Sequence, residues 1–154
     1  MKRILIVLAL LALPIALLCT QQNPLYIRVD VEIVELAEAG FKDYGIEKSL
    51  LTDIITKNFA AANIIVKSDP DLPKFLLHIK SLPTDNTIAT FVQGSFYEES
   101  TIVHTEKTIW AITWTQTNII ACPKSAYTKT VQDEAINIVN SFISDYQRRE
   151  ETIK

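Results

Sequence analysis

Large apolar residues recur at every second position along much of the chain, a spacing that is typical of β-strands. In the stretch Tyr26–Leu36, Ile27 and Val31 alternate with Arg28 and Glu32, so one side of the strand is apolar and the other is polar. The same period predicts strands at Ile64–Val66, Lys74–Leu82, Thr87–Tyr97 and Thr101–Thr117, with a short final strand at Ile119–Ala121.

Two other stretches, Gly45–Asn63 and Thr128–Arg149, have the period of a helix. Their apolar stripes are Ile46, Leu50, Ile54, Ile55, Phe59 and Ala62 in the first, and Val131, Ala135, Ile138, Val139, Phe142 and Tyr146 in the second. Such stripes need a partner surface, which the strands supply. We therefore expect an α+β fold in the order β-α-β-β-β-β-α, with a single antiparallel or mixed sheet of four to five strands and both helices packed on one face.

The stretch Thr101–Thr117 carries both tryptophans of the chain. Because Trp110 and Trp114 share one parity, a regular strand places both on the same face, and we expect that face to lie under the helices. A polar turn at Glu98–Ser100 is expected to precede this strand. The segment His104–Lys107 is expected to project beyond the core or to carry a bulge. Trp110, Trp114, His104 and Glu106 are the candidate contacts to a partner or ligand.

The first 18 residues have the pattern of a secretory signal peptide: Lys2 and Arg3 precede the apolar run Ile4–Leu18. This run is too short to span a membrane and is broken by Pro14. We expect residues 1–18 to be a signal peptide, 19–25 a tether, 26–149 a single α+β domain and 150–154 a tail. The protein is then exported and is periplasmic, anchored to the outer membrane facing the periplasm, or secreted.

Cys19 stands where the apolar run ends. The segment Ala16-Leu17-Leu18-Cys19 resembles the lipobox of bacterial lipoproteins, in which the cysteine carries the lipid, although the family prefers a small residue at the position of Leu18. Lipidation of Cys19 and its removal with the leader both stay open. In either case Cys122 has no intrachain partner, and a Cys19–Cys122 bridge requires that Cys19 survive unmodified.

Charge and composition exclude several classes of function. Loss of Met1–Leu18 removes two cations, so the net charge of −3 becomes −5. A chain with this acidic balance does not have the basic composition of a nucleic-acid-binding protein. The three scattered glycines offer no phosphate-binding loop.

Candidate chemistry is sparse. His78 and His104, with Glu98, Glu99 or Glu106, are a weak metal constellation, and two solvent-facing histidines explain them more simply. The pair Gly94-Ser95 lacks the second flanking glycine of a nucleophile elbow, and Cys122 lacks an activating histidine in its motif. No catalytic residue, metal ligand or cofactor is assigned, and the protein is interpreted as a non-enzyme.

The order of the predicted strands and helices resembles that of one group of known proteins. Leu51–Ala62 running into Ile64-Ile65-Val66, followed by Phe75-Leu76-Leu77-His78-Ile79, resembles the small outer-membrane lipoproteins of lipopolysaccharide assembly and similar envelope proteins. The resemblance implies an envelope accessory or scaffold domain that binds another envelope protein through a sheet edge or an open sheet face. Two alternatives are a carrier of a lipid or other apolar ligand between helices and sheet, and an enzyme.

Overall fold

The computed structural model describes residues 24–35 and 46–153, so the leader and Cys19 lie outside the described residues. Within these ranges five strands form one mixed sheet in the order β2-β1-β3-β4-β5. β1 is parallel to both β2 and β3, and β3, β4 and β5 form an antiparallel meander. The strands are β1 (Leu25–Glu35), β2 (Ile64–Val66), β3 (Lys74–Pro83), β4 (Thr87–Ile102) and β5 (Lys107–Pro123).

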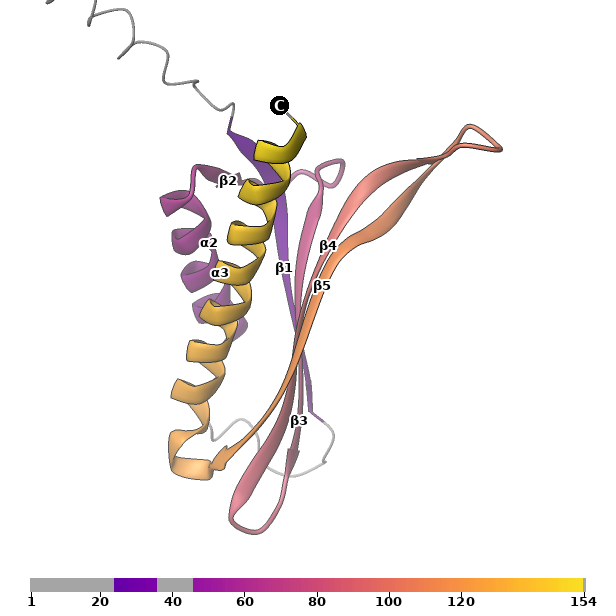
Figure 1. Cartoon of the computed structure of the whole chain (residues 1–154). Coiled ribbons are helices and arrows are strands. Elements are labelled where there is room, and N and C mark those ends of the chain that lie inside the picture. The colour runs from indigo at the N-terminus through magenta and orange to yellow at the C-terminus, as the bar shows by residue number, and fades with distance from the viewer. Residues whose placement is uncertain (1–23, 36–45, 154) are drawn as a thin grey trace, which may run out of the picture.

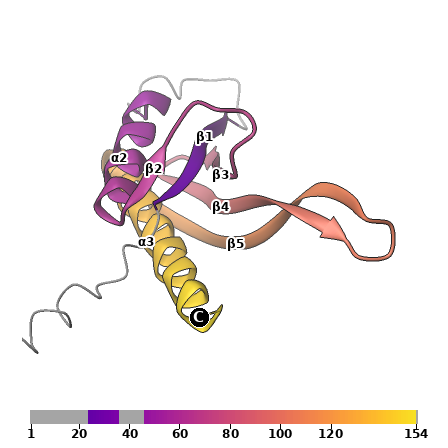
Figure 2. The ribbon, with the colours of Figure 1, turned by 90° about the horizontal axis from the view of Figure 1, so that it is seen from above.

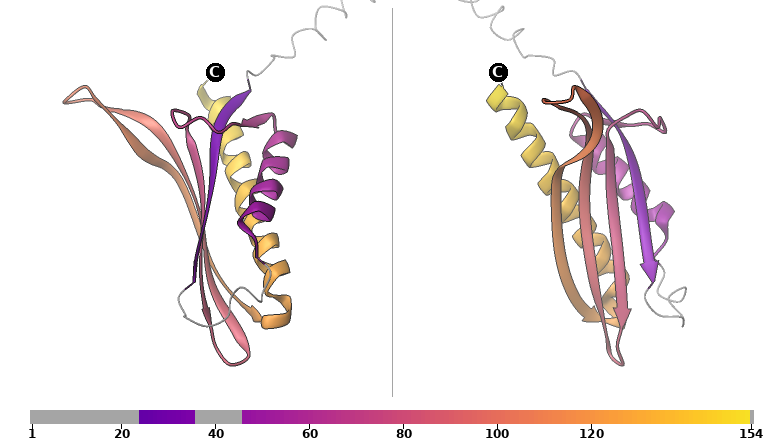
Figure 3. Two further views of the ribbon diagram at one scale, coloured as in Figure 1. Left: turned by 180° about the vertical axis from the view of Figure 1, so that it is seen from behind. Right: turned by 90° about the vertical axis from the view of Figure 1, so that its right-hand side faces the viewer.

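Two α-helices, α2 (Lys48–Ala61) and α3 (Tyr127–Ile153), cover one face of the sheet, as Figures 1 and 3 show. A single 3-10 turn, η2 (Lys124–Ala126), joins β5 to α3. The α+β fold class, the mixed five-stranded sheet and the placement of both helices are therefore confirmed. α3 runs beyond its predicted end at Arg149. No helix in the described part of the chain is long and apolar enough to cross a membrane.

α2 ends where the sequence predicts. Asn63 adopts φ 61°, a left-handed conformation that asparagine tolerates, and its N–H bonds to the carbonyl of Ala60. The buried face of α2 differs from the predicted stripe, because Leu51, Ile55 and Phe59 are buried while Leu50 is 41% exposed. These three residues lie at i, i+4 and i+8, so they share the side of the helix that faces the sheet.

The core lies between the helices and the sheet, and aromatic rings fill its centre. The ring of Phe142 on α3 lies 4.7 Å from that of Phe96, 5.8 Å from Phe59 and 5.3 Å from Phe75. α3 approaches β4 closely at Gly94, where a Cβ atom would collide with Ile138 and would lie 3.2 Å from the ring of Phe75. Burying each large side chain contributes roughly 1.5–3 kcal/mol.

A small polar cluster fixes the start of α3 against the sheet. The hydroxyl of Ser81 on β3 donates to Thr90 on β4 at 3.1 Å and pairs with the hydroxyl of Tyr127 at 2.6 Å. All three side chains are buried, so these bonds satisfy polar groups that would otherwise be costly inside the core.

The hairpin between β4 and β5 is longer than predicted. β4 continues through Glu98–Ser100, so the predicted turn there is wrong, and the turn lies at residues 103–106. It is closed by the N–H groups of Thr105 and Glu106, which donate to the carbonyl of Ile102 at 3.1 and 2.8 Å. The predicted short strand Ile119–Ala121 is the end of β5.

Residues 99–110, which we call the hairpin arm, curve away from the helices and the rest of the sheet (Figures 1 and 2). Every residue from Thr101 to Trp110 is exposed. The prediction that the segment around His104–Lys107 projects beyond the core is therefore confirmed.

Candidate functional site

A β-bulge in β5 separates the two tryptophans. Phe96 pairs with Trp114, but the next residue of β4, Tyr97, pairs with Ile112, so Thr113 is the extra residue. One extra residue reverses the alternation of the side chains that follow. Trp114 therefore faces the helices, whereas Trp110 faces the opposite side, and the expectation that both lie under the helices is wrong for Trp110.

Trp114 is a structural residue at the margin of the core. Its indole Nε1 donates to Asp145 of α3 at 3.0 Å, and its ring lies 5.3 Å from that of Phe142. The Nε1–Asp145 bond ties the outermost strand to the middle of α3.

The bulge is held by a second link to α3. Thr113 donates to the carboxylate of Glu98 at 2.5 Å, and Arg149 forms an ion pair with the same carboxylate at 3.5 Å. Burial raises the pKa of nearby Tyr146, and the carboxylates of Glu150 and Glu98 raise it further, against the opposing effect of Arg149. Glu98 is thus a strand residue with partners on β5 and α3, which explains why it does not form a turn.

The hairpin arm presents large apolar side chains that nothing in the described chain covers. Trp110 is 48% exposed and Val103 is 84% exposed. The exposed apolar residues of the arm and the adjoining part of β5 are Ile102, Val103, Ile109, Trp110 and Ile112. Apolar clusters of this kind on an element outside the core are typical of contact surfaces.

β5 is also the free edge of the sheet. It is the last strand in the order, and no charged residue occurs between Lys107 and Lys124. Edge strands commonly carry lysine, proline or inward charges that discourage pairing with another chain. From Thr108 to Cys122, β5 has none of these residues, and the bulge at Thr113 is its one irregularity, so the outer edge is suited to accept a partner strand.

The remaining candidates lie in different places. His104 and Glu106 are in the exposed turn at the tip of the arm, and Glu106 has φ 53°. His78 is in the middle of β3 opposite Gln93, with its ring 6.4 Å from that of Phe91. The two histidines are therefore not brought together, and no group of three or more metal-ligating residues occurs within residues 24–35 and 46–153.

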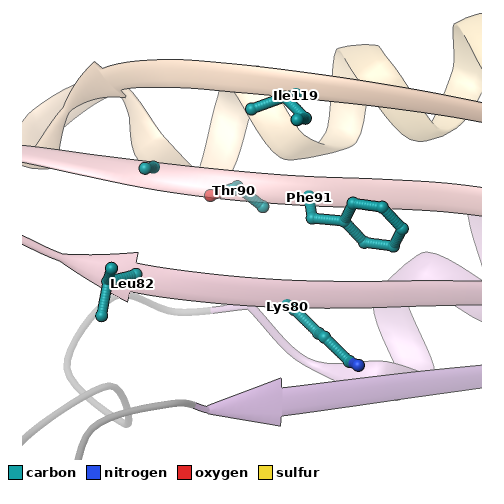
Figure 4. Close-up of a pocket in the computed structure, with 6 residues that line it drawn as sticks. Lys80, Leu82, Thr90, Phe91 and Ile119 are labelled. Carbon is teal, nitrogen blue, oxygen red and sulfur yellow. The ribbon is translucent and has the colours of Figure 1, made fainter.

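The face of the sheet opposite the helices, the open face, mixes apolar and charged residues. Near one end it carries a shallow hollow of about 370 Å³. Figure 4 shows Leu82, Phe91 and Ile119 there, from three neighbouring strands, and Ile119 is 78% exposed. The layer between helices and sheet holds the buried side chains of the core.

Cys122 lies on the helix side of β5, opposite Ile88, and is a buried free thiol. It packs among the core side chains as a small apolar residue would.

Structural comparison finds proteins with a similar arrangement at low sequence identity. A Xanthomonas campestris protein of the family DUF330 gives a TM-score of 0.46 at 9% identity, covering 86% of this chain and 93% of that one. PelC from Paraburkholderia phytofirmans, solved as a dodecamer, gives 0.44 at 10% identity over 76% and 86% of the two chains. A minor lipoprotein from Acinetobacter baumannii gives 0.33 at 11% identity over 82% and 92%.

No protein-family model matches the sequence, and no curated protein matches it. The likeness to these proteins concerns the arrangement of strands and helices, and no sequence motif carries it.

Proposed function

We propose that this protein is a non-catalytic accessory protein of the cell envelope that docks onto another envelope protein. The docking surface consists of the outer edge of β5 together with the exposed apolar residues Ile102, Val103, Ile109, Trp110, Ile112 and Ile119. The leader at residues 1–18 exports the chain, and the residues between the leader and β1 tether the domain.

One observation carries this proposal: an outermost strand with no charged residue from Thr108 to Pro123 is continuous with an arm whose apolar side chains are exposed. An added partner strand would satisfy the outward N–H and C=O groups of β5 by main-chain hydrogen bonds. Side-chain pockets on the partner would then supply specificity. Trp110 is the natural anchor, because tryptophan is enriched among the residues that dominate binding energy.

The four residues predicted as partner or ligand contacts do not all belong to the docking surface. Trp110 lies within the docking surface, and His104 and Glu106 flank it at the tip of the arm. Trp114 packs against α3 and stays outside the docking surface.

Affinity capture of the full-length protein from membranes, followed by mass spectrometry, tests the proposal. We expect the double variant Trp110→Lys, Ile112→Lys to lose its captured protein, because two charges would be desolvated at the centre of the contact. The matched control is Ile65→Lys on β2, at the opposite edge of the sheet, where the side chain is similarly exposed. Retention of the same partner by the double variant, or equal loss with Ile65→Lys, would contradict the docking surface. The same spectra report whether Cys19 carries acyl chains.

A further inference from the structure

A second hollow lies on the open face where the hairpin arm leaves the sheet. Its volume is about 340 Å³, which is within the lower range of small-ligand sites. Two cations and two aromatic rings contribute to its wall. The lining residues are Arg28, Pro70, Leu72, Lys74, Tyr97 and Trp110.

The register of the sheet sets two cations side by side in this hollow. Arg28 of β1 is the direct neighbour of Lys74 of β3, and Lys74 is the direct neighbour of Tyr97 of β4. Like charges at directly opposite positions destabilise a sheet, so this arrangement has an energetic cost in the unliganded fold.

The protein's own groups offset only part of that positive charge. The Nε of Arg28 lies 3.5 Å from the carboxylate of Asp30, and its Nη1 donates to the carbonyl of Pro70 at 3.4 Å. The Nε–Asp30 contact is an ion pair without hydrogen-bond geometry, and this Nε is buried and has no hydrogen-bond partner.

Lys74 has no carboxylate within ion-pair distance in the described part of the chain. Its Nζ lies 4.5 Å from the centre of the Tyr97 ring. Glu99 stands opposite Trp110 at the outer end of the hollow. Of the two cations in the lining, Arg28 is paired with a carboxylate and Lys74 is not.

We propose that this hollow binds a carboxylate attached to an apolar or aromatic group. One cation without a carboxylate partner matches a monoanion, whereas a phosphate monoester would bring about −1.5 to −2. The carboxylate lies against the ammonium of Lys74 and the guanidinium of Arg28, and the attached group packs on the rings of Tyr97 and Trp110. The site shares Trp110 with the docking surface, whereas Lys74 lies outside that surface, so a variant at Lys74 tests this site separately.

Isothermal titration calorimetry of the full chain with N-acetyl-phenylalanine tests the site, with the neutral amide of the same compound as the matched probe. We expect the carboxylate to bind and the amide to bind at least about fivefold more weakly. Lys74→Met should weaken the carboxylate about five- to tenfold, because methionine keeps the apolar stem and removes the charge. Lys80→Met, on the same strand and face but outside this hollow, should leave the affinity unchanged.

A short peptide ending in phenylalanine, with a free or an amidated carboxyl terminus, distinguishes the source of the carboxylate. Tighter binding of the free-terminus peptide than of N-acetyl-phenylalanine assigns the hollow to a chain terminus, and equal binding assigns it to small carboxylates. Equal affinity for acid and amide, equal effects of the two lysine variants, or no heat from any probe would overturn the proposal. Lys74→Met should still capture the envelope partner, so failure here is separate from failure of the docking surface.

Discussion

Replacement of Phe142 by alanine is expected to lower the free energy of unfolding by about 3–5 kcal/mol, the largest effect of any single substitution that we predict. Phe142 is 1% exposed, and its ring contacts those of Phe59, Phe75, Phe96, Trp114 and Tyr146. Removing it leaves a cavity at the point where both helices and three strands meet. Urea unfolding of the full chain, followed by circular dichroism, measures the change.

The control is Phe91→Ala on the open face, where one side of the ring is in solvent and the loss should be about 1 kcal/mol. Because the alanine variant can approach the total stability of a small domain, Phe142→Leu provides a measurable intermediate of about 1–2 kcal/mol. Equal losses for Phe142→Ala and Phe91→Ala would contradict a core centred on Phe142.

Removal of the hairpin arm is expected to weaken partner binding while leaving the stability of the domain nearly unchanged. Glu98 and Ala111 are directly paired, so residues 99–110 can be replaced by Asn-Gly, which forms a two-residue type I′ turn. The unfolding free energy should change by less than about 1 kcal/mol, because every residue from Thr101 to Trp110 is exposed. Affinity for the captured envelope partner should fall by more than about tenfold, because Trp110 is lost.

Two results would count against this account of the arm. A shortened protein that binds its partner with full affinity would remove the arm from the docking surface. A shortened protein that no longer folds would show that the arm contributes to the core, contrary to its exposure.

The sequence was sufficient to predict the elements and their layers. Alternation in β1 predicted the buried side correctly, since Ile27 and Val31 are both buried. The helical period predicted both helices, and Asn63 marked the end of α2. These features depend on local periodicity, which a single sequence displays directly.

The hairpin could not be predicted because its turn lacks the usual turn residues. Residues 103–106 contain no glycine, proline or asparagine, and Glu106 takes the left-handed conformation. The polar segment Glu98–Ser100 looked more like a turn, but Glu98 is fixed as a strand residue by Thr113 and Arg149.

The candidate site depends on pairing between strands, which periodicity does not reveal. The bulge at Thr113 places Trp110 and Trp114 on opposite faces of the sheet. Only the pairing of β4 with β5 reveals the bulge, because neither strand shows it alone. The edge position of β5 and the neighbouring cations Arg28 and Lys74 likewise follow from strand order and register. The uncharged stretch before Lys124 was visible in the sequence, but its meaning required knowing that β5 lies at an edge.

Site-specific photo-crosslinking in intact cells tests the docking surface most directly. A photoreactive amino acid is placed at Ile112 or Ile119 on β5, and at Lys57 on the exposed side of α2 as the control. We predict one crosslinked envelope protein from both β5 positions and none from Lys57. Crosslinking from Lys57 to the same protein, or its absence at both β5 positions, would contradict docking through the outer strand.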